Sequence, residues 1–317
     1  MRETTKEIFD KYEVRKTRKQ KTAFIDFTLD FAEKNGYEAH IEKGSFKSRN
    51  IVIGDPKTAK VTYTAHYDTC PRLPFPNFIT PKNIFIYILY QLLITVCILG
   101  VPMLIGVTVG NALDLAGVSD SIIGDVVFYL TYALIIAAFY LILAGPANPH
   151  TANDNTSGVT TLFEIMEKLP ESGRDSAAFI FFDLEEMGLI GSSSYYSKNK
   201  AAMRNKLIVN FDCVSDGKNI LFVLSKKAVC YEEALRAAFV QNDVYAPEFC
   251  SRGVFYPSDQ ASFPYGVGVA ALKKSEKHGI LYMNKIHTAN DTVYDEENIT
   301  YLSDGAVKLA SELTGNQ

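Results

Sequence analysis

Seven residues of the types that bind metal ions lie along this chain, most of them where a β-strand is expected to end. They are His66, Asp68, Asp154, Glu185, Glu186, Asp212 and His287. In open α/β sheets, binding sites form outside the carboxyl ends of the strands. Two imidazoles and three carboxylates that meet there, with two more carboxylates in supporting roles, describe a two-metal hydrolase centre. The sequence therefore predicts a metal-dependent hydrolase.

Three apolar stretches carry most of these residues. VTYTAHYDT reads as a strand that ends in His-x-Asp, FIFFDLEE as a strand followed by two adjacent carboxylates, and LIVNFD as a strand that ends in Asp212. A strand as apolar as FIFF should be buried, and two carboxylates at its end then need a cation. Taken alone, Asp154 in ANDNTSG is explained as a turn and helix N-cap, and His287 as an ordinary loop residue. The joint order of the residues favours the metal site.

The composition indicates one large α/β domain and argues against nucleic acid as a partner. With 317 residues, of which 47% are hydrophobic and 12% aromatic, the chain is able to bury a substantial core. A net charge of −4 offers no basic surface for nucleic acid. The charged N-terminus lacks the apolar core of a secretory signal. The cysteines are odd in number and without CxxC spacing, so they predict neither disulfides nor a thiolate zinc site, and a reducing compartment fits best: Cys70, Cys97, Cys213, Cys230 and Cys250.

Two uncharged stretches interrupt the α/β pattern. Residues 84–109 make a helix of about 39 Å and residues 126–144 one of about 28 Å, against the roughly 30 Å of a bilayer core. The loop between them, 110–125, makes the pair a helical hairpin that we interpret as transmembrane. The alternatives are an apolar pair buried in the interface of a homo-oligomer, or a lid over the cleft.

Outside this pair, the sequence pattern predicts a helix at residues 17–34, strands at 37–42, 50–53 and 61–65, and a helix at 156–169. Strands and helices then alternate to the end of the chain. This alternation is typical of a parallel or mixed sheet covered by helices.

The motifs HYD, NDN-x-SG, EE-x-GLIGS, NFD, SDQASF and HTANDT together resemble the di-zinc aminopeptidase family of leucyl aminopeptidase-like and glutamate carboxypeptidase-like zinc exopeptidases. The resemblance covers about residues 16–70 and 149–313. It implies an α/β fold, a phosphorylase/hydrolase-like three-layer sandwich with a mixed central β-sheet. Residues 1–70 and 149–317 would form a discontinuous zinc peptidase domain, and 71–148 an inserted helical hairpin.

The resemblance also implies a role for each site residue. His66 and Asp212 would hold one Zn²⁺, Glu186 and His287 the other, and Asp154 would bridge the two ions. Asp68 would orient His66, and Glu185 would be the general base. A cis peptide bond is implied between Asp154 and Asn155. The chain departs from the family at Gln260, where relatives often carry histidine.

The expected activity is removal of N-terminal residues from peptides, because an acidic pocket beside the metals suits a free α-amino group. Carboxypeptidase or dipeptidase action would call for a cation near the cleft, for which Arg252 is a candidate. One alternative is a glutaminyl cyclase-like, single-zinc acyltransferase, but such pockets rely on tryptophan and this chain has none. The other is an inactive membrane scaffold, although such relatives usually lose ligands.

The charges that flank the hairpin predict its orientation. The connecting loop holds Asp114 and Asp120, with Asp125 at its edge, whereas Arg72 and Lys82 precede the first apolar stretch. Under the positive-inside rule, the catalytic domain faces the cytoplasm. The sequence thus predicts a multi-pass protein of the cell membrane, with the lipid bilayer as a partner.

Overall fold

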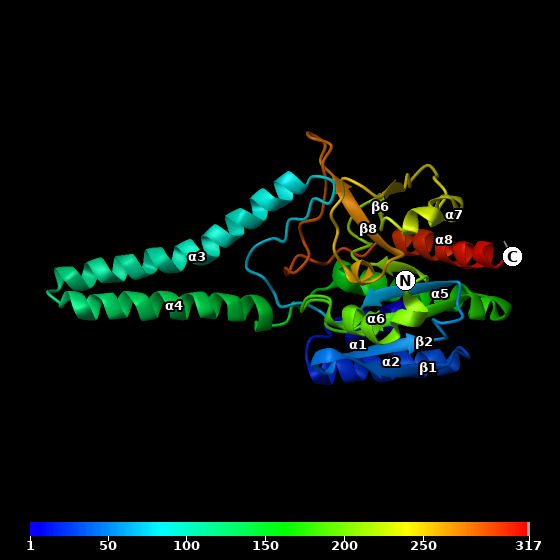
Figure 1. The fold of residues 1–317 in the computed structure, drawn as a ribbon, viewed down its shortest axis with the longest axis horizontal. Coiled ribbons are helices and arrows are strands. Elements are labelled where there is room, and N and C mark those ends of the chain that lie inside the picture. Colours follow the sequence, from blue (N-terminus) through cyan, green and yellow to red (C-terminus); the bar gives the residue numbers. More distant parts are fainter. Residues whose placement is uncertain (316–317) are drawn as a thin grey trace.

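The structure, a computed structural model, describes residues 1–315 and shows a mixed β-sheet between two layers of helices (Figure 1). Nine strands within this described range form the sheet, in the order β1-β2-β4-β3-β5-β8-β6-β7, with β9 paired to β8. The strands are β1 (Ala39–Lys43), β2 (Arg49–Ile53), β3 (Val61–His66), β4 (Ala177–Phe182), β5 (Leu207–Phe211), β6 (Asn219–Leu224), β7 (Glu248–Cys250), β8 (Gly266–Lys274) and β9 (Leu281–Tyr282). The predicted three-layer α/β sandwich with a mixed sheet is confirmed.

The centre of the sheet is parallel and fully buried. Strand β3 pairs in parallel with β4 on one side and with β5 on the other, and every residue of the three strands is buried. Their β-branched and aromatic residues suit a strand covered on both faces. His66 is in register with Phe182, so β3 and β4 end together at one edge of the sheet.

Alternate strand residues divide the core between the two faces. Phe179 and Phe181 of β4 belong to the larger core cluster, which also contains residues of α1 (Glu3–Tyr12), α2 (Arg18–Lys34), α5 (Gly158–Lys168), α7 (Glu232–Ala238) and α8 (Glu296–Gly315). Ile180 and Phe182 pack on the other face with residues of α6 (Ile190–Met203). Helix α2 begins with a capping box between Thr17 and Gln20, close to the predicted start. The predicted helix at 156–169 corresponds to α5.

The hairpin consists of α3 (Ile84–Leu115) and α4 (Asp120–Ala144), which project from the domain side by side (Figure 1). Both helices are longer than predicted, so the predicted loop 110–125 is wrong for most of its length. A helix does not have to end where its apolar stretch ends, because its backbone hydrogen bonds form in polar segments as well. Ala112, Leu113 and Leu115 are strong helix formers, and they extend α3 beyond the predicted stretch. Ser119 precedes α4, and Asp120 in its first turn suits the helix dipole.

Backbone hydrogen bonds attach the base of the hairpin to the domain. The N–H of Arg72 donates to the carbonyl of Pro146 at 2.8 Å, which joins the two ends of the insert. Ile79 and Met283 exchange two hydrogen bonds of 3.0 Å. The N–H of Phe255 donates to the carbonyl of Pro81 at 2.8 Å. The segment before α3 is therefore part of the domain surface.

Candidate metal centre

The carboxyl ends of the three central parallel strands bring the site residues together. His66 is the last residue of β3, Glu185 and Glu186 follow β4 after a short turn, and Asp212 comes directly after β5. Asp154 lies in a single π-type turn, Ala152–Ser157, which is followed directly by α5. His287 lies in the loop after β9. The seven predicted residues thus come from five segments of the sequence and meet at one edge of the sheet.

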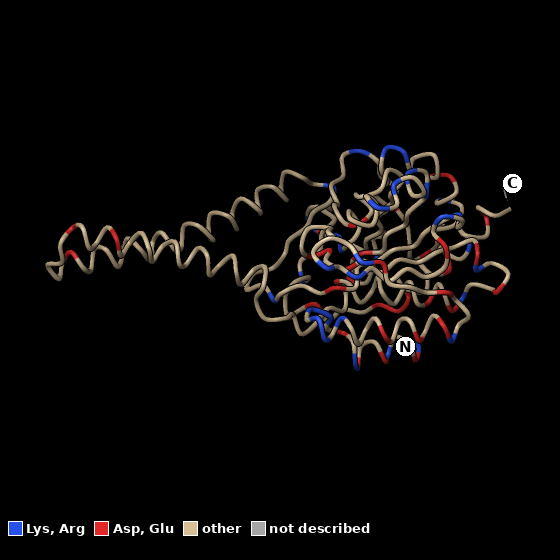
Figure 2. Tube along the Cα trace, turned by 60° about the horizontal axis from the view of Figure 1, so that its bottom comes forward, with Lys and Arg blue, Asp and Glu red and all other residues tan. Residues whose placement is uncertain are grey.

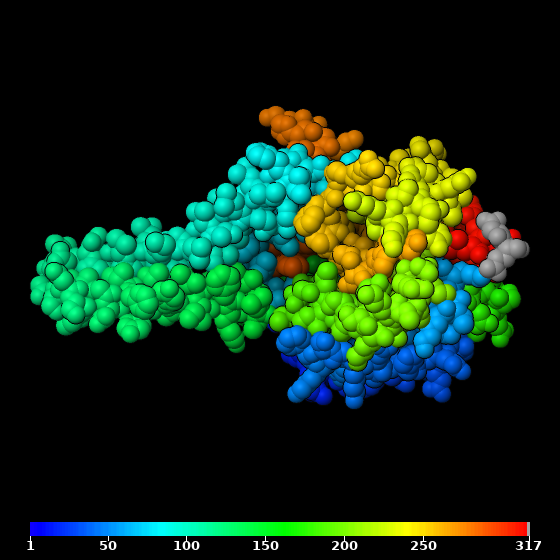
Figure 3. Space-filling model, viewed as in Figure 1, coloured from blue at the N-terminus to red at the C-terminus, as the bar shows by residue number. Residues whose placement is uncertain are grey.

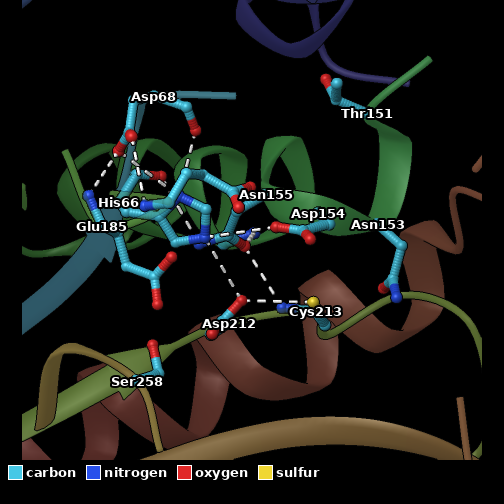
Figure 4. Close-up of polar contacts among 12 residues, drawn as sticks. His66, Asp68, Thr151, Asn153, Asp154, Asn155, Glu185, Asp212, Cys213 and Ser258 are labelled. Atoms are coloured by element: carbon cyan, nitrogen blue, oxygen red, sulfur yellow. Dashed lines mark hydrogen bonds and ion pairs between the residues drawn. The ribbon is translucent and has the colours of Figure 1, made fainter. Parts of the chain in front are cut away.

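Asp154 lies between the two histidines. Its Oδ1 is 3.3 Å from Nε2 of His66, and its Oδ2 is 2.9 Å from Nε2 of His287. Asp212 Oδ1 lies 3.5 Å from the same nitrogen of His66, and Glu186 Oε2 lies 3.2 Å from that of His287. Figure 4 shows Asp154 and Asp212 on the side of the His66 ring that faces away from Asp68. The two carboxylate oxygens of Asp154 therefore point to two separate groups of donors.

These spacings fit metal coordination. Two ligands on a tetrahedral zinc ion, each about 2.0–2.1 Å from the metal, lie about 3.3 Å apart. His66, Asp154 and Asp212 form one compact donor group, and His66 groups with Glu185 and Glu186 as well. A third group joins Glu186 and His287 to Cys70. Cys70 is a donor that the cysteine spacing did not predict.

The electrostatics of the site also call for a cation. Burial raises the pKa of Glu186 to about 8 and that of Glu185 well above its usual range. Burial works against ionisation of Asp154 too, but hydrogen bonds from His287 and His66 outweigh it and lower the Asp154 pKa. Oε1 of Glu186 is buried without a hydrogen-bond partner among residues 1–315. Crowded, buried carboxylates of this kind are stabilised by positive charge between them.

The carboxylate of Asp68 lies closer to the turn that carries the two glutamates than to the ring of His66. Its Oδ1 accepts the N–H of Glu185 at 3.0 Å, and its Oδ2 accepts the N–H of Glu186 at 3.3 Å. The Nδ1 atom of His66 lies 3.0 Å from the backbone carbonyl of Asp68 and 3.7 Å from the carboxylate. Asp68 thus contacts the ring of His66 mainly through its main chain (Figure 4).

The site contains positioning residues to which the sequence analysis gave no role. Asp291 accepts the N–H groups of Asn153 and Asp154, both at 3.0 Å. Asn153 Oδ1 accepts the N–H groups of Ser215 and Asp216 at 2.8 and 3.0 Å, which ties the turn to the segment after Asp212. Asn153 lies in the motif NDN and Asp291 in HTANDT, so the sequence signal for these two residues was a polar side chain next to a predicted metal ligand or in the same motif. The Asp154–Asn155 peptide bond is cis, as the family resemblance implied.

Two further residues come from the SDQASF motif. Asp259 is fully buried, both of its carboxylate oxygens lack a partner within the described chain, and burial raises its pKa to about 7. Gln260 Nε2 donates to the carbonyl of Tyr256 at 2.7 Å. The hydroxyl of Tyr256 in turn donates to the carbonyl of Asp212 at 3.0 Å. Gln260 therefore supports Asp212 from behind and does not line the cavity.

A cavity opens beside these side chains. Its polar lining comes from Asn77 and from the site residues other than Asp68, and no lysine or arginine lines it within residues 1–315. Arg252 is exposed and lies outside the lining. The apolar lining consists of Ile79, Tyr87, Phe255, Tyr256, Pro257 and Ile286, with Cys213.

Comparison with known proteins gives a family and several similar structures. The model of Peptidase family M28 matches residues 135–309. The aminopeptidase LapA of Legionella pneumophila is 15% identical, with a TM-score of 0.57, over 98% of this chain and 70% of LapA. A glutaminyl cyclase of Bacteroides thetaiotaomicron is 14% identical, with a TM-score of 0.57, over 96% of this chain and 94% of the cyclase.

A Zn-dependent exopeptidase from Parabacteroides distasonis is 14% identical, with a TM-score of 0.55, over 96% of this chain and 97% of its own. No curated protein matches the chain. At these identities the solved structures establish the fold alone, and the same fold carries both peptidases and cyclases.

Proposed function

Because this chain belongs to Peptidase family M28, a family of zinc peptidases, we propose that it is a two-zinc aminopeptidase that cleaves the first residue from peptides with a free N-terminus. The observation that carries the proposal is the position of Asp154, with one carboxylate oxygen toward His66 and the other toward His287. In this proposal His66 and Asp212 would hold one zinc ion, Glu186 and His287 would hold the other, and Asp154 would serve both.

The proposed roles of the remaining residues follow from their surroundings. When bound, zinc supplies Lewis-acid chemistry, which polarises the peptide carbonyl and acidifies water. Glu185 lines the cavity beside His66, and burial favours its protonated form. A carboxylate that gains a proton so readily is suited to take one from the attacking water and to return it to the leaving amine. Asp68 holds the Glu185–Glu186 turn in place through both N–H groups.

The charge of the cavity supports N-terminal cleavage. A substrate carboxylate would need a lysine or arginine, and the lining offers none within the described residues. A protonated α-amino group, in contrast, is attracted by the carboxylates of the site. The cavity therefore favours a free N-terminus over a free C-terminus.

Glutaminyl cyclisation is the second candidate, because cyclases occur among the similar structures. Two observations weigh against it. The chain contains no tryptophan. In addition, His66 and Asp212 complete a second donor group with Asp154, which a single-zinc site does not require.

We propose that α3 and α4 span a membrane, with the peptidase domain on the cytoplasmic side. Both helices have the length and composition to cross a bilayer, and most of their large apolar side chains are exposed. Pro102 is the one buried apolar side chain in the two helices, whereas a core helix buries most of its own. Gly106 and Gly110 face α4, where a Cβ atom would lie 2.3 Å from Thr131 Oγ1 and 2.8 Å from Val127 Cγ2. Such a pair of small residues, four apart, is typical of packed transmembrane helices. Figure 2 shows acidic residues at the far tip of the hairpin and basic residues on the domain alone.

A peptide panel tests the catalytic proposal. Matched peptides with free and acetylated N-termini, together with a peptide that begins with glutamine, are incubated with the full-length protein in detergent, with and without a chelator. The proposal expects chelator-sensitive release of the first residue from free N-termini only. Cleavage of acetylated peptides would indicate an endopeptidase, and pyroglutamate formation a cyclase. Bound zinc without turnover of any peptide would revive the scaffold alternative.

A further inference from the structure

The inserted hairpin contributes to the wall of the catalytic cavity. Ile79 from the segment before α3, and Tyr87 from the first turns of α3, line the same cavity as His66, Glu185 and His287. Figure 3 shows a hollow at the base of the hairpin, between the cyan start of α3 and the green end of α4, with an orange part of the C-terminal third at its floor. The insert therefore does more than attach the domain to a membrane.

Contacts with the domain hold Tyr87 in this position. Its ring centroid lies 5.7 Å from that of Phe255, a second residue of the cavity wall. The N–H of Phe255 donates to the carbonyl of Pro81, which fixes this loop to the segment before α3. Tyr87 is half-buried, whereas Phe85, Ile88 and Leu89 around it are exposed. One face of the first turns of α3 thus lines the cavity, and the other faces are exposed.

Ile79 is held more firmly, by the backbone. It exchanges two hydrogen bonds with Met283, and this partner segment continues to Ile286 and His287. Ile286 is buried and also lines the cavity. The apolar wall formed by Ile79, Tyr87, Phe255 and Ile286 is therefore connected to a proposed zinc ligand.

We propose that Tyr87 and Ile79 are specificity-determining residues, which receive an apolar side chain of the first residue of the substrate. This rests on the proposed aminopeptidase function. An aliphatic or aromatic side chain against this wall loses water from apolar surface, which favours its binding. An acidic first side chain would meet the carboxylates of the site with no cation in the lining to pair with. The substrates are then peptides that begin with a large apolar residue.

The test compares kcat/KM for peptides that differ only in their first residue: leucine, phenylalanine, alanine or glutamate. Wild-type protein should prefer leucine and phenylalanine. Tyr87→Ala should reduce the preference for phenylalanine over alanine by about tenfold, since a lost apolar contact in a pocket is worth at least this much. Tyr87→Phe should keep it. Tyr129→Ala is the matched control, because Tyr129 lies exposed on α4 and outside the lining. Zinc content is measured for every variant.

A binding measurement separates this inference from the proposed function. Calorimetry with the zinc-loaded, full-length protein compares the affinities for free L-phenylalanine and L-alanine, in wild type and in Tyr87→Ala. The wall predicts that wild type binds phenylalanine more tightly than alanine. The ratio of the two affinities should be about tenfold smaller in Tyr87→Ala. An unchanged preference in Tyr87→Ala with intact zinc would overturn the inference, even if aminopeptidase activity is found. Absence of all turnover would overturn the function, while the binding difference would still decide the role of Tyr87.

Discussion

The backbone N–H of Leu73 donates a hydrogen bond of 2.7 Å to the backbone carbonyl of His287. The first residues of the insert therefore contact the main chain of a proposed zinc ligand directly. Leu73 lies before α3, so this contact does not depend on the two helices of the hairpin.

Replacement of residues 84–144 by a flexible linker of about 20 glycine and serine residues should leave the metal centre intact. The Leu73–His287 contact remains, and a linker of this length spans on the order of 25 Å. The variant should be soluble without detergent, bind two zinc ions per chain and lose the preference for apolar first residues along with Tyr87. Centrifugation and metal analysis check this. Loss of zinc from a folded variant would show that the helices themselves support the centre.

Glu185→Gln should lower kcat by about 10²–10⁴-fold with both zinc ions retained, because the proposed base acts on water and not on the metal. Glu186→Gln is the matched control, and it should lose one zinc equivalent. Activity assays and metal analysis on the same samples separate the two effects. Near wild-type turnover in Glu185→Gln, or loss of zinc from it, would reverse the proposed roles.

Asp68→Ala should lower zinc affinity or activity by about 10–100-fold, since it removes the acceptor of the Glu185 and Glu186 N–H groups. Asp68→Asn keeps an acceptor oxygen and should lose less. Titration with a zinc chelator, together with kcat, measures both variants. Equal losses in the two would indicate that the negative charge of Asp68 matters more than its hydrogen bonds.

Cysteine labelling in intact cells tests the orientation of the hairpin. The exposed native cysteines Cys97 and Cys230, and the half-buried Cys250, are first replaced by serine. Ser119→Cys, in the turn between α3 and α4, should then react with an impermeant thiol reagent, and Ser172→Cys, on the domain, should not. The reverse pattern would place the domain outside the cell. Recovery of the protein in the soluble fraction would replace the membrane hairpin by a buried interface.

Lys21→Met should lower the apparent Tm in detergent by about 6 °C or more. Lys21 Nζ lies 2.6 Å from Asp183 Oδ1, both side chains are nearly buried, and loss of one partner from a buried pair costs about 3–5 kcal/mol. Lys19→Ala, at an exposed position of the same helix, is the control and should leave Tm unchanged. A Tm unaffected by Lys21→Met would mean that Asp183 does not need Lys21 and that neighbours such as the backbone N–H of Arg49 are sufficient to stabilise it.

Several features of the site were open to prediction because they depend on short stretches of sequence. Strand β4 is apolar at every position, so its burial and the carboxylates at its end follow from local pattern. The order of His66, Asp154, Glu186, Asp212 and His287 allowed the family resemblance to be stated. The apolarity of α3 and α4 likewise indicated a hairpin, although its helices continue beyond their apolar cores.

Contacts between distant segments could not be predicted in this way. Arg15 reads as one of many basic N-terminal residues, yet it is fully buried, and its Nε donates to the carbonyl of Tyr67 at 2.6 Å. Tyr87 reads as one aromatic residue in an apolar helix, and only the tertiary structure places its ring against Phe255 in the cavity wall. Composition and periodicity, which act over a few residues, determined the strands, the hairpin and the types of ligand in this protein. Tertiary structure decided which residues share the cavity, because those contacts join segments far apart in the chain.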